Sequence, residues 1–166
     1  ILSGEGEEIF PEFVSAVSQN KEPDINGVSY RKNGDITVSD GEFADFENTV
    51  SPYCKEYFDA LAGRIAYIES SRGCPFSCAF CLSGRCSPLR FFDMQRVKKD
   101  IIKLSQSGTQ TVKFVDRTFN ANAERANEIL LFIKENYGNE IPKTVCFHFE
   151  IAGDILKEST LEILAS

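Results

Sequence analysis

The sequence predicts an α/β fold: a partial (βα) barrel of about three parallel βα units, preceded by a strand-loop-helix remnant and a small β-hairpin. The first observation is that three strand-like segments alternate with three segments of helical periodicity after residue 63. Such alternation is typical of a parallel sheet with right-handed crossovers. The second is Asn33-Gly34 between two short alternating runs, because Asn-Gly favours a tight hairpin turn.

Composition limits the class of protein. The chain has 166 residues, of which 42% are hydrophobic and 26% are charged, which excludes disordered and fibrous classes. No apolar run approaches the roughly 20 residues that span a bilayer, and residues 1–10 lack the basic-then-apolar pattern of a signal peptide. We therefore expect a cytoplasmic protein that does not bind membranes.

Net charge and cysteine content limit the classes of ligand that the chain is expected to bind. The formal net charge of -7 argues against general nucleic-acid binding, which needs clustered Lys and Arg, so a small-molecule substrate is expected. Six cysteines without any sign of secretion favour reduced thiols or metal ligands over disulfides.

In the first third of the chain the sequence predicts a helix, a hairpin and an irregular linker. A helix is expected over 9–19, where apolar residues recur at helical spacing behind a glycine-rich, acidic turn. The runs 28–31 and 35–38 are the strands of the hairpin. Residues 39–53 are rich in Asp, Glu and Phe and are interpreted as irregular.

We therefore predict two domains, 1–53 and 54–166. The chain does not begin with Met, and its only methionine is Met94, so we interpret it as a piece of a longer protein. In the second domain, strands and helices are expected in alternation: strands over 64–70, 111–115 and 144–151, and helices over 93–107, 122–137 and 156–164.

Three cysteines follow the first of these strands. Cys74, Cys78 and Cys81 have the spacing Cys-x3-Cys-x2-Cys. Three thiolates on one loop can converge on one metal centre and leave a position open, which fits a 4Fe-4S cluster with one iron not bound by protein. A structural zinc site with Cys86 as fourth ligand is an alternative. Buried thiols without a ligand are another.

The run Arg72-Gly73-Cys74-x3-Cys78-Ala79-Phe80-Cys81 resembles the signature of radical S-adenosylmethionine (SAM) enzymes. The resemblance implies that the three cysteines hold a 4Fe-4S cluster whose fourth iron is chelated by the amino and carboxylate groups of SAM. It also implies reductive cleavage of SAM to methionine and a 5'-deoxyadenosyl radical, and an electron donor such as flavodoxin or ferredoxin. Phe80 would lie near the adenine.

Other segments resemble the subgroup that couples a cobalamin-binding domain to a radical SAM barrel. They are Gly4-Glu5-Gly6-Glu7 before a helix, Ser51-Pro52-Tyr53 as a linker, and Phe114-Val115-Asp116-x2-Phe119-Asn120. The resemblance implies that residues 1–53 are the C-terminal remnant of a cobalamin-binding-like domain and 54–166 the N-terminal half of the core. Cobalamin would bind to the full-length protein only.

The family barrel usually has six βα units, and this chain contains three. We therefore expect that the chain alone lacks full activity. An uncovered parallel edge and sheet face would also favour self-association.

Alternation in the third strand separates two faces. Thr144, Cys146, His148 and Glu150 share one face, and Val145, Phe147 and Phe149 share the other. The apolar face should meet the helices, and the polar face should line the barrel interior near the carboxyl ends of the strands. By resemblance Glu150 is the candidate contact to SAM, with a structural ion pair as the alternative. His148 could act as an acid or base or be structural.

Asp116 ends the second strand. Many family members place there a glycine-rich or acidic motif that receives the SAM amino group, although Val115-Asp116-Arg117-Thr118 has no glycine pair. Asp116 is therefore a candidate cofactor-binding residue, and capping or turn formation is the alternative. No residue is assigned as directly catalytic.

The sequence thus predicts an iron-sulfur oxidoreductase or transferase of the radical SAM type that generates the radical or drives cobalamin-dependent methyl transfer. A corrin-independent, methylthiotransferase-like radical SAM enzyme is one alternative. A non-catalytic structural zinc module is another.

Overall fold

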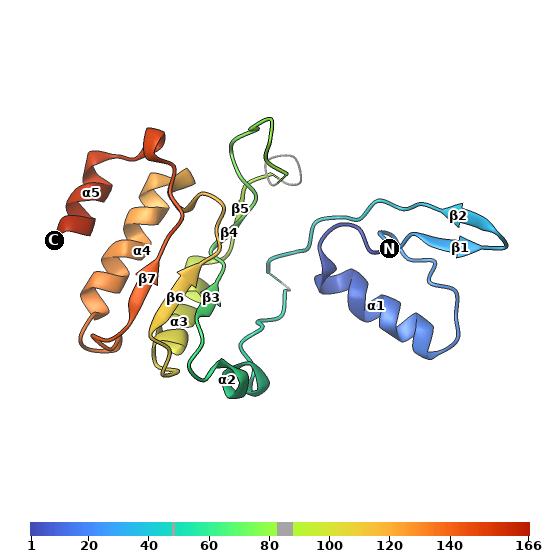
Figure 1. The fold of residues 1–166 in the computed structure, drawn as a ribbon, viewed down its shortest axis with the longest axis horizontal. Coiled ribbons are helices and arrows are strands. Elements are labelled where there is room, and N and C mark those ends of the chain that lie inside the picture. Colours follow the sequence, from blue (N-terminus) through green and yellow to red (C-terminus); the bar gives the residue numbers. More distant parts are fainter. Residues whose placement is uncertain (48, 83–87) are drawn as a thin grey trace. The chain divides into compact units, whose positions relative to one another are not determined.

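The computed structural model describes residues 1–47, 49–82 and 88–166 (Figure 1). The chain divides into two units, residues 1–51 and 52–166, which are described separately. None of the described helices is both long and apolar enough to cross a membrane.

The first unit contains helix α1 (Gly6–Ser18) and the hairpin of β1 (Tyr30–Lys32) and β2 (Asp35–Thr37). The strands pair antiparallel with Lys32 opposite Asp35. Asn33 and Gly34 both have positive φ, 52° and 96°, which a two-residue turn of the Asn-Gly type requires. The hairpin predicted from Asn33-Gly34 is therefore confirmed.

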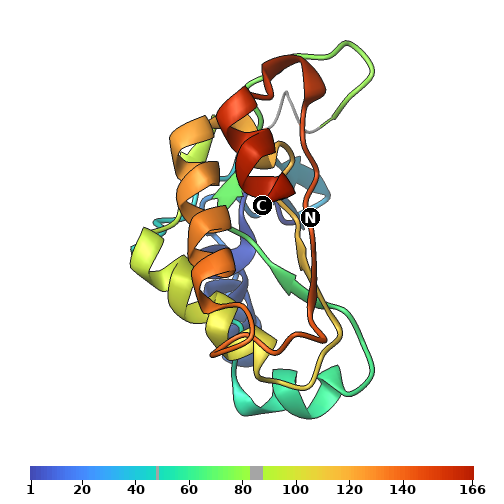
Figure 2. The same cartoon turned by 90° about the vertical axis from the view of Figure 1, so that its left-hand side faces the viewer.

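In the second unit, three parallel strands form the sheet in the order β3-β6-β7. These are β3 (Ala66–Ile68), β6 (Thr111–Phe114) and β7 (Cys146–His148). Helices α3 (Met94–Ser105) and α4 (Ala123–Asn136) lie on one side of the sheet (Figure 2). The predicted α/β class with three parallel βα units is therefore confirmed.

Burial shows which face of the sheet is covered. The residues of the covered face and of the helices against it are under 2% exposed: Ile68, Val112, Phe114, Val145, Val97, Ile101 and Ile129. Phe149 stacks on Phe114, with ring centroids 4.8 Å apart. On the other face Tyr67, Cys146 and His148 are exposed. The alternation predicted for 144–150 is present, although the strand itself is limited to β7.

Helix caps explain where the two covering helices begin. The Asp93 side chain accepts a hydrogen bond from the Arg96 amide (2.9 Å), and the Asn122 side chain accepts one from the Arg125 amide (3.0 Å). After β7 the chain forms α5 (Glu158–Ala165), which packs against α4.

Three short elements were not predicted. Helix α2 (Lys55–Leu61) precedes β3, and only Leu61 of its residues is buried; seven residues are too few for a sustained apolar period. Strands β4 (Ser71–Arg72) and β5 (Arg90–Phe91) pair antiparallel on either side of residues 74–88, which the sequence indicates as a loop. Two-residue strands are too short to produce a periodic signal.

Candidate functional site

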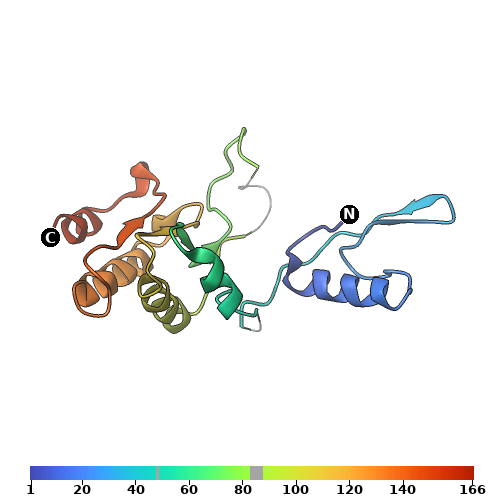
Figure 3. The ribbon, with the colours of Figure 1, turned by 60° about the horizontal axis from the view of Figure 1, so that its bottom comes forward.

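The cysteine loop, residues 73–89, begins and ends on the β4-β5 pair. Ser71 lies opposite Phe91 and Arg72 opposite Arg90, and the Phe92 amide donates to the Ser70 carbonyl (3.1 Å). The described part of the loop extends away from the sheet beyond the carboxyl ends of the strands (Figures 1 and 3). The two ends of the loop are therefore held together next to the sheet.

Gly73 lies directly against Pro88 at the other end of the loop. Its φ is +97°, and a Cβ atom at this position would lie 2.3 Å from the Pro88 carbonyl oxygen. Contacts this short do not occur, and this φ favours glycine. Gly73 is thus required by the path of the loop immediately before Cys74.

The three predicted cluster ligands, Cys74, Cys78 and Cys81, all lie on this loop. Cys78 is exposed, whereas Cys74 and Cys81 are half-buried. The Cys81 amide donates a hydrogen bond to the Cys78 carbonyl (3.1 Å), and Cys74 Sγ lies 3.4 Å from Thr118 Oγ1. Among the described residues, no three His, Cys, Asp or Glu side chains are grouped closely enough to hold a metal ion. Cys86, the alternative fourth ligand, lies outside the described residues.

Asp116 directly follows β6 and is 1% exposed. Its carboxylate accepts hydrogen bonds from the Ser70 amide (3.1 Å), the Ser70 hydroxyl (2.7 Å) and the Ser71 hydroxyl (2.5 Å). Burial raises the pKa of the Asp116 carboxyl above its usual range, and the hydrogen bonds from Ser71 and Ser70 oppose this rise. In this structure Asp116 holds the base of the cysteine loop.

Arg125 supports the same base from the other side. Its Nη2 donates to the carbonyls of Phe92 (2.6 Å) and Ser70 (3.2 Å), and its guanidinium lies over the Phe91 ring at 5.1 Å. We did not predict this residue. Its place in the first turn of α4, where a cation opposes the helix dipole, is a weak hint in the sequence and no periodic pattern marks it.

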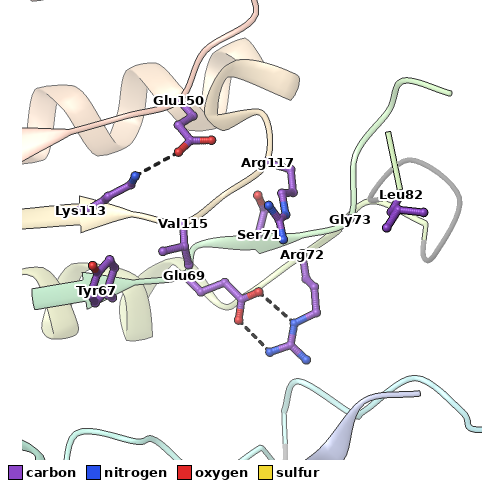
Figure 4. A pocket seen from close by; sticks show the side chains of 10 residues that line it. All are labelled: Tyr67, Glu69, Ser71, Arg72, Gly73, Leu82, Lys113, Val115, Arg117 and Glu150. Atoms are coloured by element: carbon purple, nitrogen blue, oxygen red, sulfur yellow. Dashed lines mark hydrogen bonds and ion pairs between the residues drawn. The ribbon is translucent and has the colours of Figure 1, made fainter. Parts of the chain in front are cut away.

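A cavity of about 680 Å³ lies on the uncovered face of the sheet, against the cysteine loop (Figure 4). Side chains from the sheet and the loop line it together: Tyr67, Glu69, Ser71, Arg72, Gly73, Leu82, Lys113, Val115, Arg117 and Glu150. The cavity is therefore lined by residues in or just after all three parallel strands, by β4 and by Gly73 and Leu82 of the cysteine loop.

Two ion pairs lie within the cavity wall. Arg72 binds Glu69 through two nitrogens, with Nε 2.9 Å from Oε1 and Nη2 2.7 Å from Oε2. Lys113 Nζ lies 3.1 Å from Glu150 Oε1 (Figure 4). Because each pair places opposite charges at the same wall, the cavity suits a ligand that carries both signs of charge.

Only some of the predicted site residues line this cavity. Glu150 lines it, as do Gly73 and Leu82 of the loop. Phe80 lies on the loop and is 93% exposed. Asp116 is not among the described residues that line the cavity, since its carboxylate is directed to Ser70 and Ser71.

Comparison with known proteins yields a relative in sequence. The chain is 31% identical over 149 residues to an uncharacterized methyltransferase of Pyrococcus horikoshii, a match that covers 81% of this chain and 32% of the relative. The chain thus spans about a third of that protein. No protein-family model matches the chain.

Solved structures share the fold. The radical SAM methyltransferase TsrM from Kitasatospora setae, with tryptophan substrate and a SAM analogue bound, matches 99% of this chain with a TM-score of 0.74 and 17% identity. TsrM with cobalamin and a 4Fe-4S cluster bound matches with a TM-score of 0.69. The cobalamin-dependent SAM radical enzyme OxsB matches 97% of the chain with a TM-score of 0.65 and 20% identity.

The chain covers 34% of the first TsrM structure and 24% of OxsB. At these identities the comparisons establish a shared fold. The resemblance to cobalamin-dependent radical SAM enzymes predicted from the sequence is thereby confirmed for the fold of nearly the whole chain.

Proposed function

We propose that this chain supplies the cluster- and SAM-binding part of a cobalamin-dependent radical SAM methyltransferase. The observation that carries the proposal is the position of the Cys-x3-Cys-x2-Cys loop beside the cavity at the carboxyl ends of three parallel strands. Active sites of such α/β barrels lie at this end.

The donor set fits a cluster with one open iron. Cys74, Cys78 and Cys81 lie on one loop, and thiolates are the usual ligands of iron-sulfur clusters. We propose that these residues hold a 4Fe-4S cluster, and that binding brings the three sulfurs together, since metal binding commonly orders its own site. When bound, such a cluster supplies an electron and an open iron position to SAM.

The cavity fits SAM by its charge. SAM carries a sulfonium, an amino group and a carboxylate, and the cavity wall carries Glu69 and Glu150 together with Arg72, Lys113 and Arg117. We assign Glu150 to a polar contact with SAM and the exposed Phe80 ring to packing on its adenine. Asp116 is reassigned to positioning the loop base, because its carboxylate already accepts three hydrogen bonds.

Methyl transfer is the outcome that the comparisons favour over other radical chemistry. The relative from Pyrococcus horikoshii is a methyltransferase, and TsrM is a radical SAM methyltransferase. We propose a small-molecule methyl acceptor, cobalamin bound by the full-length protein, a flavodoxin or ferredoxin as electron donor and a cytoplasmic location.

Anaerobic reconstitution with iron and sulfide tests the proposal. We expect about four irons per chain, an absorption spectrum of the 4Fe-4S type, and an electron paramagnetic resonance (EPR) signal of the reduced cluster that SAM alters. Cys78→Ala should lose the cluster. Cys146→Ala is the matched control, because Cys146 is also a free, exposed thiol but lies on β7.

Two results would contradict the proposal. Tight binding of zinc in place of iron, without any response to SAM, would favour the structural zinc module. A cluster that forms equally in Cys78→Ala and in the wild type would exclude the assigned ligands. Corrin binding by the full-length protein would separate the proposed subgroup from corrin-independent radical SAM enzymes.

A further inference from the structure

The Thr118 hydroxyl is directed at one of the proposed cluster ligands. Thr118 Oγ1 lies 3.4 Å from Cys74 Sγ, across 44 residues of sequence. Thr118 is 5% exposed and Cys74 is half-buried, so the contact is largely shielded from water. A hydroxyl and a sulfur at this distance form a hydrogen bond in which either group can donate.

The segment that carries Thr118 is fixed on both sides. The Thr118 carbonyl accepts from the Ala121 amide (3.0 Å), and the Phe119 amide donates to the Glu150 carbonyl (2.8 Å). The Asn120 side chain donates to the Ala152 carbonyl (2.8 Å) and accepts from the Ala152 amide (2.9 Å). The Thr118 hydroxyl is therefore held next to β7 and its following residues rather than on a freely moving loop.

The other partner of the contact is fixed by the same segment. Asp116 lies two residues before Thr118 and binds Ser70 and Ser71, which lead directly to Gly73 and Cys74. The residues from Asp116 to Thr118 thus hold the first cysteine through two independent points. This arrangement presents the Thr118 hydroxyl to the Cys74 sulfur.

We propose that Thr118 is a positioning residue that donates a hydrogen bond to the Cys74 thiolate and raises the reduction potential of the cluster. The inference rests on the proposed function, because it needs Cys74 as a cluster ligand. A ligating thiolate has no proton, so the Thr118 hydroxyl must be the donor. The reduced cluster carries one more negative charge than the oxidised cluster, and a hydrogen bond to sulfur stabilises it more.

The test compares midpoint potentials of reconstituted clusters at one pH. Thr118→Val removes the hydroxyl and keeps the shape, and should lower the potential. The equilibrium between the two oxidation states should shift about tenfold, which corresponds to about 59 mV for a one-electron couple. Thr118→Ser keeps the hydroxyl and should have the midpoint potential of the wild type. If the role of Thr118 were purely structural, Thr118→Val would leave the potential unchanged.

Thr160→Val is the matched control. Thr160 is also a buried threonine, 3% exposed, and its hydroxyl donates to Asn127 Oδ1 (2.7 Å) on α4. This variant loses a buried hydroxyl hydrogen bond away from the cysteine loop, and its cluster potential should equal that of the wild type. If Thr118→Val does not fold, Thr118→Ala removes the same hydroxyl, and the same fall in potential is expected.

The outcomes separate the two proposals. A wild-type chain that binds no iron-sulfur cluster overturns the proposed function and this inference together. A cluster with four irons whose potential is the same in wild type and Thr118→Val overturns only the role of Thr118. If the midpoint potential falls equally in Thr118→Val and in Thr118→Ser, the role of Thr118 is also overturned, because the effect then does not come from the hydroxyl.

Discussion

The Ser71 hydroxyl donates a 2.5 Å hydrogen bond to the Asp116 carboxylate, which joins β4 to the residues after β6 across 45 positions of sequence. Ser70 adds its amide and its hydroxyl to the same carboxylate. Three buried donors thus share one acceptor group at the point where the chain enters the cysteine loop. The carboxylate fixes the direction in which the loop leaves the sheet.

Replacing Asp116 by Ala should destabilise the protein strongly. The change leaves the Ser70 and Ser71 donors without their acceptor in a buried place, and each buried polar group without a partner costs about 1–3 kcal/mol. We expect the free energy of unfolding to fall by about 2–4 kcal/mol in urea denaturation followed by circular dichroism. Asp59→Ala is the control, because Asp59 pairs with Lys55 on the surface and its loss should change stability by less than about 0.5 kcal/mol. Equal effects of the two substitutions would contradict the role of Asp116.

The raised pKa of Asp116 predicts the sign of a pH dependence of the stability. Burial raises the pKa of the folded state above its ordinary value of 3.8, so the folded protein binds this proton more readily than the unfolded chain. The free energy of unfolding should therefore fall as the pH rises from about 3.8 to the folded pKa, and its Asp116 contribution should level off above it.

Asp116→Asn isolates this contribution because Asn does not titrate. We expect the stability of the wild type minus that of Asp116→Asn to decrease through this pH window. Burial also raises the pKa of Asp100, but Asp100 is present in both proteins and its contribution cancels. A difference that increases with pH would show that hydrogen bonds, rather than burial, dominate the pKa of Asp116.

Gly73 and Gly34 form a matched pair for testing the loop base. Their φ angles are +97° and +96°, but a Cβ at Gly73 would meet the Pro88 carbonyl, whereas a Cβ at Gly34 has open space around it. Gly34→Ala should cost about 1–2 kcal/mol, the usual cost of this backbone conformation in an L-residue. Gly73→Ala should cost more and should also reduce iron bound on reconstitution. Equal losses of stability and unchanged iron content would show that the loop base can shift to accept a side chain.

Periodicity and turn chemistry predicted the elements that carry the core. Helix α3 lies within the predicted range 93–107 because Val97, Ile101 and Leu104 form an apolar stripe that packs on the sheet. The hairpin follows from Asn33-Gly34 alone, since few other pairs adopt two positive φ angles. These signals are local, and therefore a single sequence is enough to detect them.

The features that shape the site depend on contacts between distant residues, and the sequence did not predict them. The spacing of the cysteines indicated the loop, but the β4-β5 pair below it has only two residues in each strand. Asp116 was located correctly at the end of its strand, whereas the direction of its carboxylate depends on Ser70 and Ser71, which come much earlier in the chain. Arg125 and Thr118 also act across the fold, and no periodic pattern marks either of them.

Glu150 allows ligand binding to be separated from stability. Its side chain is 50% exposed and lies 3.1 Å from Lys113 Nζ, and such exposed pairs contribute about 0–1 kcal/mol. Glu150→Gln should therefore change the free energy of unfolding by less than about 1 kcal/mol. If Glu150 contacts SAM as a charged acceptor, the same substitution should raise the Kd for SAM about tenfold, measured by titration of the EPR signal of the reduced cluster.

Glu128→Gln is the control for Glu150→Gln. Glu128 has the same 50% exposure and pairs with Lys98 at 2.7 Å, but it lies on α4 and does not line the cavity. This variant should bind SAM as the wild type does. If the two variants bind SAM equally well, then Glu150 serves only as the partner of Lys113, and the polar contact to SAM comes from another residue of the cavity wall.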